Sequence, residues 1–322
     1  MSTDRKAIKY DFEPEVARMR KDVLGGLARD PKILPSQYLY DERGAVLFDQ
    51  ICDTQDYYVT QTEISILRKN LDQIKELIGP DAVVIEPGSG SGVKTKLLLE
   101  GLDDPAGYVP IDVAKKQLAE FAASMDKAYP DLDVTPVCAD FTAEYELPQH
   151  VEEHRKRIIY FPGSTIGNFM PDVALGLLRH MRQLCGSSGG ILIGVDLRKE
   201  HGILERAYDD SEGVSKDFAM NYLVRLNREL NAEFTMDSFD YEAVFNEGES
   251  RIEMALVSLQ DQTVSLDGAD VTFKKGERVR TEVSYKYSLE DFAGLAAKAG
   301  LKVEAVWMDE RRLFSIQYLV NA

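Results

Sequence analysis

A glycine-rich turn separates an apolar run from a helical pattern in the first third of the chain. The apolar run Ala82-Val-Val-Ile85 leads into Glu86-Pro-Gly-Ser-Gly-Ser-Gly92, and helical spacing follows from Lys94 to Leu99. Because glycine has no Cβ, the backbone of such a turn can approach a bound ligand closely. A strand, a glycine turn and a helix in this order predict an α/β sheet that holds a nucleotide-like ligand at the end of this strand.

The alternation of strand and helix patterns continues along the chain. Strand-like runs are predicted at 82–86, 107–111, 134–138, 157–161 and 190–195, with helix-like stretches between them. This order predicts a parallel, doubly wound sheet. Near the C-terminus, a helix at 289–299 precedes strands at 301–308 and 313–320. Such an ending is similar to the class I methyltransferase fold, a Rossmann-like sheet whose last strand is antiparallel.

The remaining segments do not follow this alternation. Residues 14–30 and 62–77 have helical spacing, residues 205–230 are helical in character, and residues 234–286 alternate as strands do. We therefore expect two domains. Residues 61–199 and 287–322 are expected to form the domain with the parallel sheet, which holds the nucleotide-like cofactor, and residues 1–60 and 200–286 an α+β substrate-binding domain.

Composition narrows the function classes. The formal net charge of −17 disfavours nucleic acid and anionic membranes as partners, so a small-molecule substrate is expected. Apolar runs stay well below the roughly 20 residues that span a bilayer. Three widely spaced cysteines indicate a reducing cytoplasm rather than a disulfide framework. We expect a cytoplasmic monomer that needs no metal.

Polar groups follow four of the predicted strands, where open α/β sheets bind their ligands. Glu86 would repel a pyrophosphate and attract a sulfonium compound with a free amine. Asp112 is placed to accept the ribose hydroxyls, and Asp140 with Phe141 to meet an adenine. The fourth group is Gly163-Ser-Thr-Ile-Gly-Asn168. The coincidence predicts S-adenosylmethionine, although each element alone also fits a tight turn or a helix cap.

Lys94 is a cation near the expected sulfonium. It needs a carboxylate partner there, and both the carboxylate of the cofactor's methionyl part and Glu86 are suitable. A solvated lysine in the first turn of a helix is the alternative interpretation.

Long strings in this chain resemble the histidine-specific Nα-methyltransferases of ergothioneine biosynthesis, over nearly its whole length. The strings are Tyr38-Leu-Tyr-Asp-Glu-Arg-Gly-Ala-Val-Leu-Phe-Asp-Gln50, Tyr57-Tyr-Val-Thr-Gln-Thr-Glu63, Glu86-Pro-Gly-Ser-Gly90, Gly163-Ser-Thr-Ile-Gly-Asn168, Ala207-Tyr-Asp209, Arg251-Ile-Glu-Met254 and Thr281-Glu-Val-Ser284. The resemblance implies transfer of three methyl groups from S-adenosylmethionine to the α-amine of L-histidine. The product would be hercynine, formed through mono- and dimethylated intermediates.

The resemblance also implies roles for single residues. The cofactor would be held by Gly88, Lys94, Asp112, Asp140 and Phe141, together with Glu86, Gly90 and Gly163 of the glycine turns. Tyr57, Glu282 and Ser284 would meet the imidazole. Asn168 and Tyr208 would hold the carboxylate and amine end, with Tyr40 near the amine and Met254 beside the ring.

Side-chain chemistry agrees with these implied roles. Each of the two imidazole nitrogens needs a partner when buried, and a carboxylate with a hydroxyl provides both. Methyl transfer to a neutral amine needs in-line placement rather than a metal or a covalent intermediate. Tyrosine faces and hydroxyls tolerate an amine that becomes a quaternary cation.

Three rival functions remain open. They are a methyltransferase for another amino acid such as tryptophan or a derivative, a nicotinamide-dependent oxidoreductase, and a binding protein without catalysis. His150-Val-Glu-Glu-His154 matches a zinc-protease pattern. It lies in a polar stretch, where a solvated helix is the better interpretation.

Overall fold

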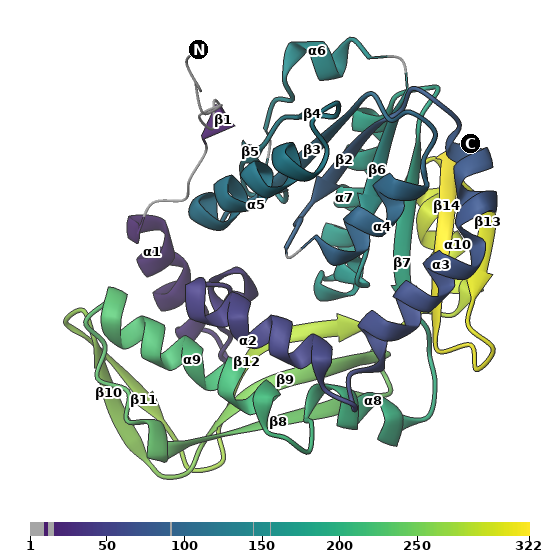
Figure 1. The fold of residues 1–322 in the computed structure, drawn as a ribbon. Helices are drawn as coiled ribbons and strands as arrows, with labels where there is room; N and C mark the ends of the chain where they lie inside the picture. Colours follow the sequence, from purple (N-terminus) through teal and green to yellow (C-terminus); the bar gives the residue numbers. More distant parts are fainter. Residues whose placement is uncertain (1–9, 12–15, 91, 144, 155) are drawn as a thin grey trace. The chain divides into compact units, whose positions relative to one another are not determined.

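The computed structural model describes residues 10–11, 16–90, 92–143, 145–154 and 156–322 (Figure 1). The chain divides into two compact units. Unit 1 comprises Met1–Glu13, Val59–Arg198 and Tyr287–Ala322, and unit 2 comprises Pro14–Tyr58 and Lys199–Lys286. Ser91 of the glycine turn lies outside the described residues.

Unit 1 is built on one sheet in the order β1-β5-β3-β2-β6-β7-β14-β13, with β4 beside β3. Its strands are β1 (Tyr10–Asp11), β2 (Val83–Pro87), β3 (Gly107–Asp112), β4 (Asp133–Val134), β5 (Val137–Cys138), β6 (Arg157–Phe161), β7 (Gly190–Asp196), β13 (Leu301–Met308) and β14 (Phe314–Asn321). Neighbours from β5 to β7 pair in parallel, whereas β14 is antiparallel to both β7 and β13. This confirms the class I methyltransferase sheet with its antiparallel last strand.

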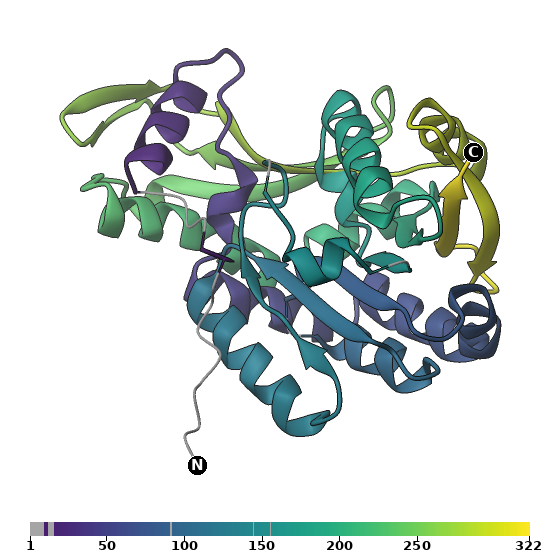
Figure 2. The ribbon, with the colours of Figure 1, turned by 90° about the horizontal axis from the view of Figure 1, so that it is seen from above.

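Helices cover both faces of this sheet, and Figure 2 shows α5 and α7 on opposite faces. The helices of unit 1 are α3 (Tyr58–Ile78), α4 (Val93–Gly101), α5 (Lys115–Ala128), α6 (Gln149–Glu152), η2 (Thr165–Asn168), α7 (Pro171–Cys185) and α10 (Leu289–Lys298). Coverage on both faces explains the unbroken apolar runs: every residue of β2 and β7 is buried.

The predicted strand at 134–138 is wrong as a single element. The structure has β4 and β5 there, separated by Thr135 and Pro136. Proline has no N–H to donate to a sheet ladder, so it interrupts the pairing with β3.

Unit 2 is an antiparallel sheet in the order β12-β9-β8 with a separate hairpin of β10 and β11. The strands are β8 (Phe239–Asn246), β9 (Arg251–Ser258), β10 (Gln262–Leu266), β11 (Ala269–Phe273) and β12 (Arg278–Tyr285). The helices are α1 (Val16–Leu27), η1 (Ser36–Leu39), α2 (Glu42–Asp53), α8 (His201–Tyr208), α9 (Val214–Glu229) and η3 (Met236–Ser238). Helix α9 packs on β8 and against α2.

The helical character expected at 205–230 is confirmed, and the structure divides it between α8 and α9. The break follows from Asp210, whose carboxylate accepts the N–H groups of Val214 at 3.0 Å and Ser215 at 2.7 Å. These bonds satisfy N–H groups in the first turn of α9 that have no partner within the helix. Gly213 precedes that turn with a φ of 77°, in the left-handed region that glycine favours.

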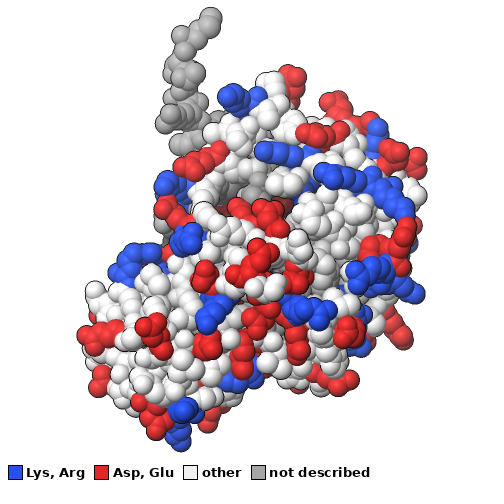
Figure 3. Space-filling model, turned by 60° about the horizontal axis from the view of Figure 1, so that its bottom comes forward, with Lys and Arg blue, Asp and Glu red and all other residues white. Residues whose placement is uncertain are grey.

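Within the described part of the chain, each helix is too short or too polar to cross a membrane. On the face of the described residues that Figure 3 draws, Lys and Arg side chains are interspersed with Asp and Glu. The chain thus shows there a mixed surface and not one continuous basic patch.

Candidate functional site

The glycine turn after β2 is held by the neighbouring strand. Gly88 donates its N–H to the carbonyl of Ile111 at 2.7 Å and has a φ of +73°. A Cβ on Gly88 would lie 3.3 Å from Cε1 of Phe141. The glycine therefore leaves room for the phenyl ring beside the turn, and the structure brings these two sequence-predicted residues together.

Glu86 lies beneath this turn and is 1% exposed. Its carboxyl accepts hydrogen bonds from Thr95 Oγ1 at 2.6 Å and from the hydroxyl of Tyr108 at 2.5 Å. Burial raises the pKa of Glu86 to about 7, although these two hydrogen bonds and Lys94 lower it. The carboxyl is thus a buried support of the turn whose charge changes near neutral pH.

Lys94 has its ion pair with Glu63, not with Glu86. The Lys94 Nζ lies 2.6 Å from Glu63 Oε2, and the same carboxylate accepts the N–H of Gly163 at 2.9 Å. A Cβ on Gly194 would collide with Glu63 Oε1, so this glycine makes the space for the carboxylate. Glu63 is 1% exposed. It joins two expected cofactor residues that come from separate segments.

Sequence reasoning assigned no role to Glu63, although it ends the string that begins at Tyr57. The signal was available: a carboxylate on the apolar face of α3, between Val59 and Leu67, needs a buried partner.

Two aspartates at the strand ends form local turns. Asp112 Oδ1 accepts the N–H of Ala114 at 2.9 Å, and Asp140 Oδ1 accepts the N–H of Thr142 at 3.0 Å. Burial raises the pKa of Asp112, against the backbone hydrogen bonds that lower it. These hydrogen bonds fix the orientation of the two carboxyl groups at the strand ends.

The turn after β6 has a strained backbone. Gly163 has a φ of +79° and Ser164 one of +57°. The Ser164 Oγ accepts the N–H of Asp196 at 2.9 Å, which holds the turn against the end of β7. Asn168 closes η2 and is half-buried. Strain of this kind, fixed by surrounding contacts, is typical of ligand sites.

Unit 2 contains an aromatic cluster that includes three predicted substrate residues. Tyr40 lies edge-on to Phe48 at 5.6 Å and to Phe218 at 5.3 Å between ring centroids. Tyr57 lies edge-on to Tyr208 at 5.8 Å and to Phe48 at 6.4 Å. Sequence reasoning missed Phe48 and Phe218, whose rings connect tyrosines from separate segments into one wall.

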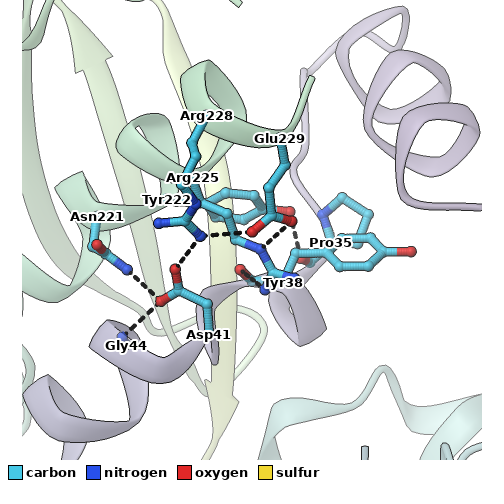
Figure 4. Close-up of polar contacts among 9 residues, drawn as sticks. All are labelled: Pro35, Tyr38, Asp41, Gly44, Asn221, Tyr222, Arg225, Arg228 and Glu229. Carbon is cyan, nitrogen blue, oxygen red and sulfur yellow. Dashed lines mark hydrogen bonds and ion pairs between the residues drawn. The ribbon is translucent and has the colours of Figure 1, made fainter. Parts of the chain in front are cut away.

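The loop that carries Tyr40 is tied down by its neighbour Asp41 (Figure 4). Asp41 caps α2 by accepting the N–H of Gly44 at 2.8 Å, and it also accepts from Asn221 at 2.8 Å and pairs with Arg228 at 2.7 Å. Burial raises the pKa of Asp41, but the hydrogen bonds from these groups outweigh it and hold the pKa below its usual value. A Cβ on Gly44 would collide with the carbonyl of Leu39.

Strand β12 presents two polar groups on one face, because residues two apart on a strand point the same way. These are Glu282 and Ser284. Glu282 pairs in register with Met254 of β9 and is hydrogen-bonded to Tyr40. Burial raises the pKa of Glu282 to about 8, against the hydrogen bond from Tyr40 and the charge of Lys286. Ser284 is 1% exposed and lies 2.8 Å from the hydroxyl of Tyr208.

Lys286 is a further residue that sequence reasoning missed. It is 1% exposed and follows β12 directly. Its Nζ donates to the hydroxyl of Tyr208 at 2.7 Å and to Ser284 Oγ at 2.8 Å. The alternating pattern offered a signal, since Lys286 continues the face that Glu282 and Ser284 begin.

The predicted residues fall into two sets. Unit 1 holds Asn168 and the predicted cofactor residues, whereas unit 2 holds the other predicted substrate residues. No group of three His, Cys, Asp or Glu side chains with metal-binding geometry occurs among the described residues. His150 lies 3.5 Å from Asp133 and His154 lies 3.6 Å from Asp81, so the two histidines face different carboxylates.

Known proteins match this chain over nearly its whole length. The sequence profile of the histidine-specific, SAM-dependent methyltransferases, in which SAM is S-adenosylmethionine, matches residues 19–321. The histidine N-alpha-methyltransferase of Mycolicibacterium smegmatis is 38% identical over 308 residues, which cover 94% of this chain and 95% of that protein. The protein of the same description from Mycobacterium tuberculosis is 36% identical, with 92% and 93% covered.

One of the solved structures to which this chain is similar is an S-adenosylmethionine-dependent methyltransferase from Clostridium acetobutylicum. It is 10% identical with a TM-score of 0.48, and the match covers 87% of this chain and 98% of that one. The profile match and the two mycobacterial relatives establish that the chain belongs to the family of histidine-specific, S-adenosylmethionine-dependent methyltransferases.

Proposed function

We propose that the protein transfers three methyl groups from S-adenosylmethionine to the α-amine of L-histidine and so forms hercynine, the first step of ergothioneine biosynthesis. Family membership supports the reaction class. The observation that carries the substrate is the pair Glu282 and Ser284 on one face of β12, with Met254 beside it. A carboxylate and a hydroxyl satisfy both nitrogens of an imidazole.

The cofactor residues of unit 1 suit S-adenosylmethionine. Gly88 opens the turn beside Phe141, whose ring is available to an adenine. Asp112 is proposed to accept the ribose hydroxyls and Asp140 an adenine amino proton. Lys94, held by Glu63, is proposed to bind the cofactor's carboxylate. When bound, S-adenosylmethionine supplies the methyl group from its sulfonium.

Some substrate residues of unit 2 are proposed to bind the imidazole ring, and others the amine end. Glu282 and Ser284 are proposed to bind the imidazole with Tyr57. Asn168 is proposed to bind the carboxylate, and the ring of Tyr208 to lie at the amine end. The faces of Tyr40 and Tyr57 accept a growing, finally quaternary ammonium through cation–π attraction. The same residues can therefore serve histidine and its mono- and dimethylated intermediates. Aromatic faces do not depend on the amine N–H groups, which are lost one by one as methyl groups are added.

Deprotonation of the substrate amine needs no dedicated base in this scheme. A sulfonium beside an ammonium lowers the ammonium pKa because like charges disfavour the charged form. The residues at the amine end would then hold the neutral amine in a reactive orientation toward the methyl group, since such positioning supplies much of the rate of a group transfer.

A panel of free amino acids tests the substrate assignment. S-adenosylhomocysteine release is measured with histidine, tryptophan, phenylalanine and tyrosine at equal concentration. Histidine is expected to react at least about tenfold faster, since an indole or phenyl ring leaves buried polar groups unpaired. Equal or faster release with tryptophan would make the rival methyltransferase the correct assignment. A thermal shift with NAD but not with S-adenosylhomocysteine would favour the oxidoreductase.

We also propose a monomer in the cytoplasm. The net charge of −17 opposes self-association, and Cys52, Cys138 and Cys185, all within the described residues, form no disulfide with one another, which suits a reducing compartment. Sedimentation at micromolar concentration tests the monomer, and a dimer mass would overturn it.

A further inference from the structure

A buried ammonium requires polar partners, because burying a charge is costly unless such partners compensate it. Lys286 is 1% exposed, and its backbone is fixed by two bonds with Ser250: its N–H donates to the Ser250 carbonyl and its carbonyl accepts from Ser250 Oγ, each at 2.8 Å. The ammonium also lies 4.4 Å from the centroid of the Tyr208 ring. The lysine is thus held with its charge against Tyr208 and Ser284.

The direction of the hydrogen bonds in this trio follows from counting protons. An ammonium only donates, so both hydroxyl oxygens accept from Lys286. The two oxygens are 2.8 Å apart, and one hydroxyl therefore donates to the other. The pair has two hydroxyl hydrogens and uses one internally. Since Lys286 accepts none, the second hydrogen is directed to an acceptor outside the trio.

We propose that Lys286 is a positioning residue that makes the Tyr208–Ser284 pair a hydrogen-bond donor toward the substrate ring. Tyr208 donates to Ser284, and Ser284 donates to the unprotonated imidazole nitrogen, while Glu282 accepts the N–H of the other nitrogen. This role rests on the proposed function. Without the lysine the pair can reverse and accept instead, so the site no longer requires an acceptor nitrogen in its ligand.

The charge of Lys286 supports the other half of the same site. Burial raises the pKa of Glu282, and the charge of Lys286 lowers it. The lysine therefore favours the ionised carboxylate, which can accept an N–H. One cation therefore helps to keep an acceptor and a donor in place for the two ring nitrogens. A neutral imidazole has one N–H and one bare nitrogen, and it matches this arrangement.

Calorimetry on the wild-type protein and two variants tests the proposal. The ligands are histidine and 3-(2-thienyl)alanine, whose ring has similar size but neither an N–H nor a nitrogen acceptor, both with S-adenosylhomocysteine present. In Lys286→Met we expect the preference for histidine to fall about tenfold or more. In Lys216→Met, which removes an exposed lysine of unit 2, the preference is expected to stay the same. An unchanged preference in Lys286→Met overturns the proposal.

A double variant separates positioning from packing. If Lys286 acts through the hydroxyl pair, its replacement by Met weakens histidine binding less in a Ser284→Ala background, by no more than about twofold. Equal losses in both backgrounds overturn the proposal. If Lys286→Met does not fold, Lys286→Gln is used. The amide of Gln adds an acceptor, so this variant is expected to lose part of the preference for histidine. A Lys286→Gln protein that keeps the full preference also overturns the proposal.

The outcome for the proposed function is read separately. A wild-type protein that forms no hercynine refutes the proposed function. A wild-type protein that forms hercynine, with an unchanged ring preference in Lys286→Met, refutes only the role of Lys286.

Discussion

Replacement of Glu63 by Gln tests the connection between Lys94 and Gly163. The carboxylate lies 2.6 Å from the Lys94 ammonium and 2.9 Å from the Gly163 nitrogen, and it is 1% exposed. Gln keeps the shape and one acceptor oxygen but removes the charge. Hydrogen bonds to charged groups contribute about 1.5–3 kcal/mol. The lysine side chain is 20% exposed, so water compensates part of the loss.

We therefore expect the free energy of unfolding of unit 1 to fall by about 2 kcal/mol in Glu63→Gln. The loss in Glu63→Ala is expected to be larger, about 3–5 kcal/mol, because the Gly163 N–H then also loses its partner and a cavity forms. Affinity for S-adenosylhomocysteine is expected to fall about tenfold or more in both, since Lys94 loses its counter-charge in each variant and Gly163 also loses its partner in Glu63→Ala.

Urea unfolding and calorimetry measure the two quantities. Glu76→Gln is the matched control, because Glu76 lies on the same helix α3 but is exposed. The control is expected to change stability by less than about 0.5 kcal/mol. A Glu63→Gln protein as stable as the control, with unchanged cofactor affinity, would refute the role given to Glu63.

Three further predictions concern other carboxylates. The pKa of Glu86 is raised from 4.5 to about 7, so its contribution to stability is complete below pH 4.5 and is lost as the pH rises through 7. The loss is on the order of 3 kcal/mol, and Glu86→Gln should remove this pH dependence from a series of unfolding curves against pH. Glu282→Ala should lower kcat/KM for histidine about 10–100-fold with unchanged S-adenosylhomocysteine affinity, and equal loss of both would argue for a structural role. Asp41→Ala should destabilise unit 2 by about 2 kcal/mol in urea, because the cap of α2 and the Arg228 pair are lost together, and a loss below about 0.5 kcal/mol would contradict this.

Local patterns made much of the fold predictable. The apolar run before Gly88 is the buried strand β2, and the two runs at the C-terminus are β13 and β14. These strands were predictable because the apolar pattern of a strand is set by residues that are neighbours in the sequence. The break between α8 and α9 was also readable. Asp210 is a capping residue and Gly213 a helix-start glycine, and both are signals that the sequence carries locally.

The missed site residues act through contacts that sequence separation conceals. Glu63 is 31 residues from Lys94 and 100 from Gly163, and only the sheet topology brings the three segments together. Lys286 is two residues from Ser284 but 78 from Tyr208, so its contact with Tyr208 became visible only when α8 was placed on the sheet of unit 2. The Lys94–Glu63 pair likewise required the fold, since charge alone matched Glu86 as well.

Mass spectrometry of the product from L-histidine and S-adenosylmethionine tests the central claim most directly. The account predicts that histidine gains three methyl groups, all on the α-nitrogen, with hercynine as the final species and the mono- and dimethylated forms only transient. A product that stops at one methyl group, carries it on the ring, or does not form at all would contradict the account.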